Sequence, residues 1–184
     1  MDSATLAAAL SIVVRLHGHT TPDRDLLNRA QKRVAVVLSH SGIEVLWRSC
    51  GEASPADANC NATPGANEAV IRFLAGPSTE TPDSCGVALV PRQGHGHFIS
   101  LFVDCVHVAA DRLSVAEDVV LGGVLAHEIG HLLLGTNSHG SSGLMQAQPR
   151  PIDWQRAAHD ALGFTKDETR RLREAVRRRM TQRE

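Results

Sequence analysis

Short apolar runs and one longer stretch with helical spacing make up the first half of the chain. Runs of about four to eight residues, rich in Val and Ile and bounded by turn residues, are typical of buried strands. Apolar side chains that recur every three or four residues from Leu26 to Leu38 predict a helix that begins at Thr21-Pro22 and stops at Gly42. The order strand, helix, strand favours a right-handed parallel crossover and hence an α/β fold. Strands are predicted over residues 10–16, 43–47, 69–74, 86–90 and 98–103.

The second half of the chain is predicted to be helical. Ser114, with Glu117 three residues later, forms a capping-box pattern before an apolar stretch that runs to Gly135. Gly122 and Gly123 inside this stretch each cost about 1 kcal/mol relative to Ala. We therefore expect close packing contacts at these two glycines.

Two further helices are predicted after a Gly/Ser/Asn-rich segment. One covers residues 153–162, and the other is capped by Thr165 with Glu168 three residues later. Arg177, Arg178 and Arg179 near the end of this last helix are expected to complement its dipole and to keep the surface soluble. No repeat, low-complexity tract or linker divides the chain, so we predict one domain.

The composition limits the classes of partner. The chain has 184 residues, of which 42% are apolar, with 19 basic and 20 acidic residues and a formal net charge of −1. Neither this charge nor the C-terminal arginines, which lack interleaved aromatics, favour a nucleic-acid partner. No apolar run reaches the roughly 20 residues of a membrane span, and Asp2 stands where a signal peptide needs positive charge. We expect a monomer without membrane or nucleic-acid partners.

The four cysteines, Cys50, Cys60, Cys85 and Cys105, form no zinc-knuckle spacing. Two disulfides are the simplest interpretation. Cys50 and Cys60 flank a polar loop that suits a local bond, and Cys85 and Cys105 lie at opposite ends of a predicted strand pair. Disulfides would indicate a secreted or periplasmic location, whereas four buried thiols in a cytosolic protein are the alternative.

The motif His127-Glu128-Ile129-Gly130-His131 lies in the long apolar helix. Residues i and i+4 share one helix face, so the two imidazoles are placed to bind one Zn²⁺ ion. Glu128 is the candidate catalytic residue, a general base and acid that takes a proton from metal-activated water and passes it to the leaving amine. Two histidines and a glutamate in a buried helix are costly unless a metal compensates them.

His139 is the candidate third zinc ligand. A catalytic zinc takes three protein ligands and keeps a fourth position open. Gly135 can end the helix through a positive φ angle, after which the chain can turn back and bring His139 toward the two helical histidines. The alternative is a solvated loop histidine.

The segment from His127 to Met145 resembles the metzincin superfamily of zinc endopeptidases. In that family an HExxH helix ends at a Gly, a third His binds the metal, and a tight turn places a Met beneath it. Gly135, His139 and Met145 follow the motif in this order, with the spacing HExxHxxxGxxxH. The Gly falls one residue later, and the third His two residues later, than in the usual family pattern. The competing interpretation of Met145 is an adaptable core filler.

The resemblance implies a fold and an activity. It implies an α/β (α+β), metzincin-like domain over residues 1–184, with a mixed five-stranded sheet, a backing helix and the active-site helix in residues 1–135. The Met turn and the C-terminal helices would occupy residues 136–184. It also implies a zinc-dependent endopeptidase with one catalytic Zn²⁺, whose peptide or protein substrate binds along an antiparallel edge strand, Gly86 to Val90. Because the chain has no Tyr, oxyanion stabilisation would fall to zinc and backbone groups.

Three alternatives remain open from the sequence. A gluzincin-type peptidase takes its third ligand from a later helix, and Glu174 is then the candidate, since Asp153 and Glu168 are explained as helix-start residues. The chain could instead be a catalytically inactive zinc- or peptide-binding domain of the same fold. The third alternative is a structural α/β domain with an accidental HExxH.

Two other sequence features are weaker candidates. His95 and His97 could bind a second metal, although we expect a solvated turn. Arg150 and Trp154, soon after Met145, could line the substrate cleft, although a solvated arginine and a helix-anchoring tryptophan are the simpler expectation.

Overall fold

The computed structural model describes residues 9–18, 20, 22–50, 58–76, 84–93 and 95–182. None of the helices in these ranges combines the length and the apolar character needed to cross a membrane. The elements are β1 (Leu10–His17), α1 (Arg24–Ser39), β2 (Ile43–Ser49), the short 3₁₀ turn η1 (Ala58–Cys60), β3 (Glu68–Leu74), β4 (Gly86–Ala88), β5 (Phe98–Phe102), α2 (Val103–Leu113), α3 (Glu117–Leu134), α4 (Pro151–Ala158) and α5 (Lys166–Thr181).

The strands form one mixed sheet in the order β2-β1-β3-β5-β4. β1 pairs in parallel with β2 and β3, and β3 pairs in parallel with β5. β4 pairs with β5 in the antiparallel direction and lies at one edge of the sheet. The parallel crossover from β1 through α1 to β2 and the antiparallel edge strand are therefore confirmed. β4 ends at Ala88 and is therefore shorter than the predicted strand, which ran to residue 90.

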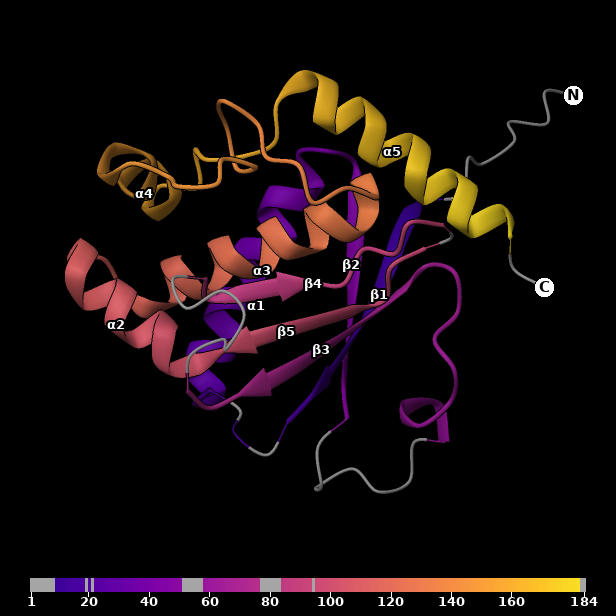
Figure 1. Ribbon diagram of the computed structural model, residues 1–184, viewed down its shortest axis with the longest axis horizontal. Helices are drawn as coiled ribbons and strands as arrows, with labels where there is room; N and C mark the ends of the chain where they lie inside the picture. The colour runs from indigo at the N-terminus through magenta and orange to yellow at the C-terminus, as the bar shows by residue number, and fades with distance from the viewer. Residues whose placement is uncertain are drawn as a thin grey trace, which may run out of the picture.

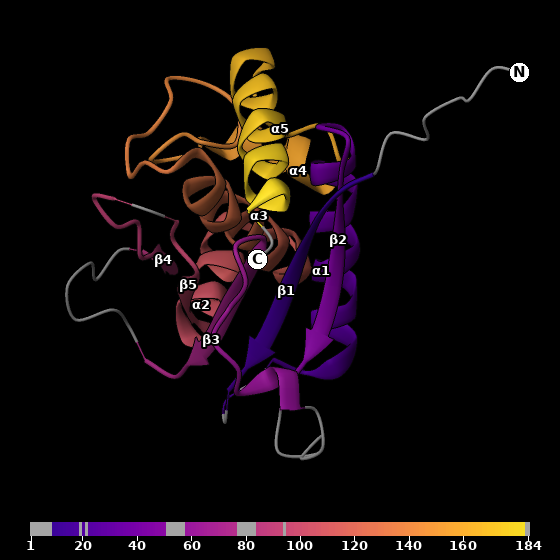
Figure 2. The ribbon, with the colours of Figure 1, turned by 90° about the vertical axis from the view of Figure 1, so that its right-hand side faces the viewer.

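The core lies between this sheet and two helices that pack side by side on it, α1 and α3 (Figures 1 and 2). Alternate residues of each strand point to the helices, as the two-residue period of a strand requires. α5 lies beyond the C-terminal half of α3 (Figure 1). The buried strand residues include Ile12, Val14, Leu16, Ile43, Ala69, Ile71, Phe73, Ile99 and Leu101, and they meet Ala30, Val34 and Leu38 of α1 and Leu121, Leu125 and Ile129 of α3.

Two helix starts differ from the prediction. α1 is capped by Asp23, whose carboxylate accepts hydrogen bonds from the Asp25 and Leu26 amides; Thr21 lies outside the described residues. α3 begins at Glu117 without a side-chain cap, and Ser114 instead ends α2 in the left-handed conformation, with φ 54°. The capping box predicted at Ser114 is therefore wrong, because this serine is needed to turn the chain between two helices.

The helix α2 was not predicted. The strand expected to reach Val103 ends at Phe102, and the chain then turns directly into a helix that buries Val106 and Ala110. The C-terminal prediction was better, since Thr165 caps α5 and Glu168 completes the capping box. The interpretation of Arg179 as a surface residue is wrong: its side chain is buried, because it faces the core side of α5.

Both predicted disulfides are present. Cys50 pairs with Cys60 (Cα–Cα 5.5 Å) and Cys85 with Cys105 (Cα–Cα 5.1 Å). Cys85 directly precedes β4, and Cys105 lies on α2 rather than at a strand end, so the second disulfide joins the edge strand to a helix.

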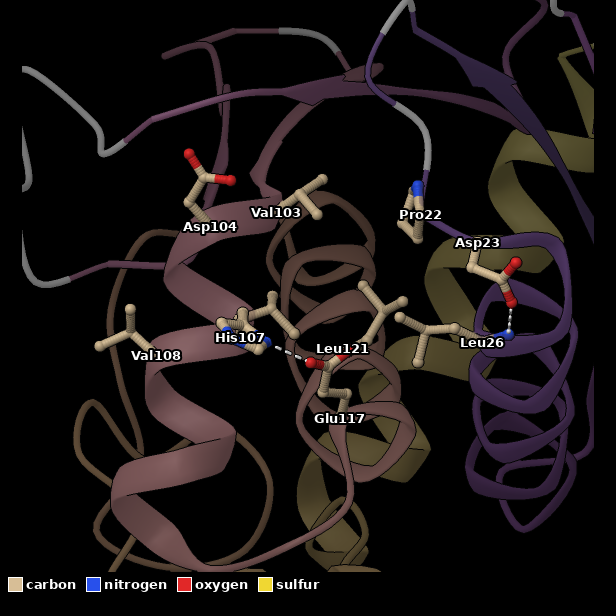
Figure 3. A pocket seen from close by; sticks show the side chains of 10 residues that line it. Pro22, Asp23, Leu26, Val103, Asp104, His107, Val108, Glu117 and Leu121 are labelled. Atoms are coloured by element: carbon tan, nitrogen blue, oxygen red, sulfur yellow. Dashed lines mark hydrogen bonds and ion pairs between the residues drawn. The ribbon is translucent and has the colours of Figure 1, made fainter.

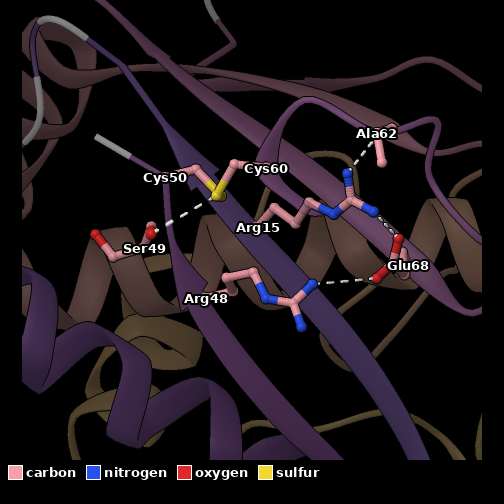
Figure 4. Close-up of a disulfide and its surroundings, with 7 residues drawn as sticks. All are labelled: Arg15, Arg48, Ser49, Cys50, Cys60, Ala62 and Glu68. Atoms are coloured by element: carbon pink, nitrogen blue, oxygen red, sulfur yellow. Dashed lines mark hydrogen bonds and ion pairs between the residues drawn. A yellow bond between two sulfur atoms is a disulfide. The ribbon is translucent and has the colours of Figure 1, made fainter. Parts of the chain in front are cut away.

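The Cys50–Cys60 bond lies beside a buried ion pair (Figure 4). Arg15 of β1 pairs with Glu68 of β3 and donates a 2.7 Å hydrogen bond to the Ala62 carbonyl. Arg48 of β2 lies 3.5 Å from the same carboxylate. The disulfide and the Arg15 hydrogen bond together tie Cys60 and Ala62 to the sheet.

Candidate metal centre

The C-terminal half of α3 presents the two histidines of the HExxH motif on one side. The His127 ring bonds through Nδ1 to the Leu144 carbonyl at 2.8 Å, and the His131 ring bonds through Nδ1 to the Thr136 carbonyl at 2.7 Å. A carbonyl only accepts, so each Nδ1 carries the proton and each Nε2 carries a lone pair. This arrangement is the usual one for histidines that bind a metal through Nε2.

His139 joins this pair after a sharp reversal of the chain. Gly135 ends α3 with φ 65°, and its amide donates to the His131 carbonyl at 3.0 Å. The imidazoles of His127, His131 and His139 then come together, with one potential ligand atom from each lying within 4.8 Å of the others. The glycine and the third histidine come later than in the usual metzincin spacing, but the three histidine side chains still meet.

The three imidazoles fit a metal ion. The Nε2 atoms of His127 and His131 are 2.9 Å apart, and two lone pairs at this distance repel unless a cation lies between them. Burial lowers the pKa of His127 to about 4 and also lowers the pKa of His131, so both rings are neutral, which is the form that binds metals. Three imidazoles are a donor set that suits a catalytic zinc.

Glu174, the ligand expected of a gluzincin-type site, is not part of this cluster. It lies exposed on α5, with its carboxylate 3.6 Å from the Arg170 guanidinium. Within the described ranges, no second group of three metal-ligating side chains forms. His95 bonds to Gln182 and His97 to the Glu68 carbonyl, so each of these two histidines links the segment after β4 to a residue far away in the sequence.

Glu128 is buried between α3 and the edge strand. Burial raises the pKa of its carboxyl to about 7, against a smaller opposing effect of the hydrogen bond from the Ala88 backbone. At Gly86, a Cβ atom would lie 2.7 Å from Glu128 Cγ and 2.8 Å from Val124 Cγ1. A side chain at position 86 would therefore displace β4 from the helix that carries the glutamate.

Met145 packs against α3 between the two histidines. A Cβ at Gly130 would lie 2.6 Å from Met145 Sδ and 2.8 Å from Phe164 Cε1. The turn before Met145 contains Gly143, with φ 75°, and is held by the Leu144 amide, which donates to the Gly163 carbonyl at 2.8 Å. The contact between Gly130 and Phe164 was not predicted, although a glycine in the middle of a helix is a signal of such close packing.

Two other glycines of α3 have the close contacts that we expected. A Cβ at Gly122 would lie 2.9 Å from the Cβ of Arg33 on α1, and one at Gly123 would lie 2.9 Å from the Trp154 ring on α4. Trp154 therefore anchors its helix. Arg150 is largely exposed and pairs with Asp153 at 3.0 Å, which fits the expectation of a solvated arginine.

The cavity drawn in Figure 3 is separate from the histidine cluster. It has a volume of about 430 Å³ and lies between the start of α1, α2 and the first turns of α3, with Leu26, Val106, His107 and Leu121 among its lining residues. The Glu117 carboxylate bonds to His107 across one side and raises the pKa of this imidazole. The histidine cluster lies toward the opposite end of α3, so the cavity is no part of the candidate metal centre.

Comparisons with known proteins support the fold but not a close relationship. No protein-family model matches the chain, and no curated protein matches it. The structure is similar to the crystal structure of archaemetzincin from Methanopyrus kandleri, with a TM-score of 0.58 and 14% identity over 94% of this chain and 99% of that one. It is also similar to metalloproteinase-II from Bacteroides fragilis, with a TM-score of 0.52 and 14% identity over 91% of this chain and 53% of that one.

The resemblance of the sequence to metzincins is therefore matched by the structure. The α/β fold, with its mixed five-stranded sheet and α3 behind the edge strand, is the fold of these two proteins. His127, His131 and His139 form a cluster able to hold a metal ion. The chain has a metzincin-like fold with a candidate three-histidine metal centre.

Proposed function

We propose that the protein is a zinc-dependent endopeptidase in which His127, His131 and His139 hold one Zn²⁺ ion. The observation that carries the proposal is the convergence of three histidines beside Glu128, a buried carboxyl on the same helix. An accidental HExxH in a structural domain gives no reason for a third histidine to meet the first two. Zinc bound at this cluster would supply a Lewis acid that polarises the scissile carbonyl and lowers the pKa of a water molecule.

Glu128 moves the proton in this proposal. Its buried carboxyl can accept a proton from the attacking water and return it to the leaving amine. The Ala88 backbone hydrogen bond and the close approach of Gly86 keep the side chain in one place. The proton that leaves the water ends on the amine, so Glu128 is unchanged after each turnover.

The substrate is a peptide or protein segment that extends the sheet at β4. β4 is an edge strand, with β5 on one side, and an extended peptide can add to such an edge through backbone hydrogen bonds. Because β4 lies directly over Glu128, a peptide added there would run past the metal centre. Strand addition binds the backbone at several residues on both sides of the scissile bond, which favours cleavage within a chain.

We also propose that the protein works outside the cytosol. Both pairs of cysteines form disulfides, and such bonds persist in secreted or periplasmic proteins.

Peptide cleavage by matched variants tests the proposed function. The zinc-loaded protein, Glu128→Gln, His139→Ala and the control Glu174→Gln are each assayed with a fluorogenic peptide library. We expect cleavage by the wild type and by Glu174→Gln, which alters an exposed carboxylate on α5. Glu128→Gln should bind zinc without turnover, because it keeps the three histidines, whereas His139→Ala should lose zinc.

Two results would contradict the proposal. Zinc-loaded wild type that cleaves no peptide in a broad library would point to a zinc- or peptide-binding domain. Full zinc content in His139→Ala together with loss of zinc in Glu174→Gln would assign the third ligand to α5.

A further inference from the structure

Arg179 is one of the largest fully buried side chains of the described residues. It continues the inward face of α5, on which Leu172 and Val176 are also buried. Arginine is rarely buried this completely unless it is paired. The position therefore needs an explanation beyond the solubility of an arginine-rich helix.

The guanidinium of Arg179 joins three backbone segments that are far apart in sequence. Nη2 donates to the Leu132 carbonyl on α3, and Nη1 donates to the carbonyls of Gly96 at 3.3 Å and Ala66 at 3.4 Å. Gly96 lies between β4 and β5, and Ala66 lies just before β3. One side chain thus connects α5 to the end of α3 and to the beginnings of two strands.

The Leu132 carbonyl belongs to the last turn of α3, where carbonyls lack a helical partner. His131 precedes this residue, and the chain reaches His139 soon after it. A Cβ at Gly96 would lie 2.6 Å from Leu132 Cδ2 and 2.7 Å from the Leu89 carbonyl. The segment that follows β4 therefore packs on α3 at the residue that Arg179 binds.

The energetics of this arrangement argue against a role in stability alone. Desolvation by burial lowers the pKa of Arg179 to about 10, so the side chain stays charged at neutral pH. Within the described residues its Nε is buried without a hydrogen-bond partner. A buried charge that has no carboxylate partner in the part of the chain the structure describes is costly compared with an apolar side chain of similar size. The specific gain from arginine is that one rigid planar group fixes three carbonyls at once.

We propose that Arg179 is a positioning residue. It fixes the end of α3, which carries the metal-site histidines, relative to the segment that follows β4. The inference rests on the proposed metal site. In this role, α5 keeps the edge strand β4 aligned with the metal site.

Cobalt binding by matched variants tests this role. Co²⁺ affinity of the metal-free protein is measured by competition with a chelator, and the visible absorption of the Co²⁺ complex reports the ligand geometry. The variants are Arg179→Met, which removes all three hydrogen bonds, and Arg179→Lys, which keeps the charge but lacks the planar fork. Leu172→Ala is the control, because it removes buried packing from the same helix without touching α3 carbonyls. Urea denaturation of each variant measures stability separately.

We expect Arg179→Met to weaken Co²⁺ binding by about tenfold or more, the range found for residues that orient metal ligands, and to change the absorption spectrum. Arg179→Lys should have the same effects to a smaller extent and carries the test if Arg179→Met does not fold. Leu172→Ala should be less stable but bind Co²⁺ like the wild type.

Wild-type affinity and spectrum in both Arg179 variants would overturn the inference and leave the metal site intact. Equal loss of affinity in Leu172→Ala would reduce Arg179 to a general structural role. A wild-type protein that binds no Co²⁺ would overturn the proposed metal site, and this inference with it.

Discussion

The two disulfides are expected to stabilise the fold by similar amounts but to differ in their effect on the metal centre. Cys50 and Cys60 are 10 residues apart in sequence, and Cys85 and Cys105 are 20 apart. The loop-entropy relation for a cross-link gives about 2.7 kcal/mol for the first bond and about 3.3 kcal/mol for the second. Replacing both cysteines of either pair by alanine should therefore lower the free energy of unfolding by about 3 kcal/mol.

The difference between the bonds comes from β4. This strand has three residues, and Cys85 directly precedes it. Gly86 lies against Glu128, and the Ala88 backbone hydrogen-bonds to the same carboxylate. Without the bond to Cys105, the strand loses its covalent link to α2 and keeps only its short ladder with β5 and its packing on α3, so Glu128 should become more accessible to water. The Cys50–Cys60 bond lies beside Arg15 and Glu68 (Figure 4), with no contact of this kind to Glu128.

Urea denaturation and peptide cleavage of the two double variants separate these effects. We expect similar losses of stability, with a large loss of kcat/KM confined to Cys85→Ala/Cys105→Ala. The Cys50→Ala/Cys60→Ala protein is the matched control for stability. Equal losses of kcat/KM in the two proteins, at a temperature where both are folded, would refute the role assigned to the edge strand. Unchanged stability in both would refute the loop-entropy estimate.

Three further predictions concern α3. Burial raises the pKa of Glu128 to about 7 in the metal-free protein. The contribution of Glu128 to the free energy of unfolding therefore falls as the pH rises from about 4.5 to 7. In urea titrations with a chelator, Glu128→Gln should be more stable than wild type at pH 8, by on the order of 2 kcal/mol, and similar to it at pH 4. Arg33→Met should cost about 1.5–3 kcal/mol in thermal denaturation, because Asp118 is buried and accepts a 2.6 Å bond from Arg33; an unchanged Tm would contradict this. Gly130→Ala should gain about 1 kcal/mol of helix propensity but lose about 1–3 kcal/mol to overpacking against Met145. A variant that is more stable than wild type in urea denaturation would contradict this, because it would mean that Met145 moves aside at no cost.

The elements that could be predicted from the sequence are those whose signal is local. The parallel strands are short runs rich in Val, Ile and Leu, and α5 has a complete capping box at Thr165 and Glu168. α2 could not be separated from the preceding strand, because Val103 continues the apolar run of β5 without a turn residue. Ser114 matched an N-cap pattern, but it takes a left-handed conformation at the end of α2, which depends on how two helices meet.

The same distinction holds for the candidate site. His127, Glu128 and His131 are recognisable because their spacing on one helix is sufficient. Bringing His139 to them depends on the reversal at Gly135, which the glycine made predictable. The contact of Phe164 with α3 and the three carbonyls bound by the buried arginine of α5 link segments far apart in the chain, and no local pattern records such contacts.

The most direct test of the central claim is the coordination of the metal in the purified protein. Elemental analysis combined with X-ray absorption at the zinc edge gives the stoichiometry and the ligand distances. We predict one zinc ion per chain with three imidazole nitrogens at about 2.0–2.1 Å, and loss of bound zinc from His139→Ala. A protein without stoichiometric zinc, or a zinc shell that His139→Ala leaves unchanged, would contradict the account.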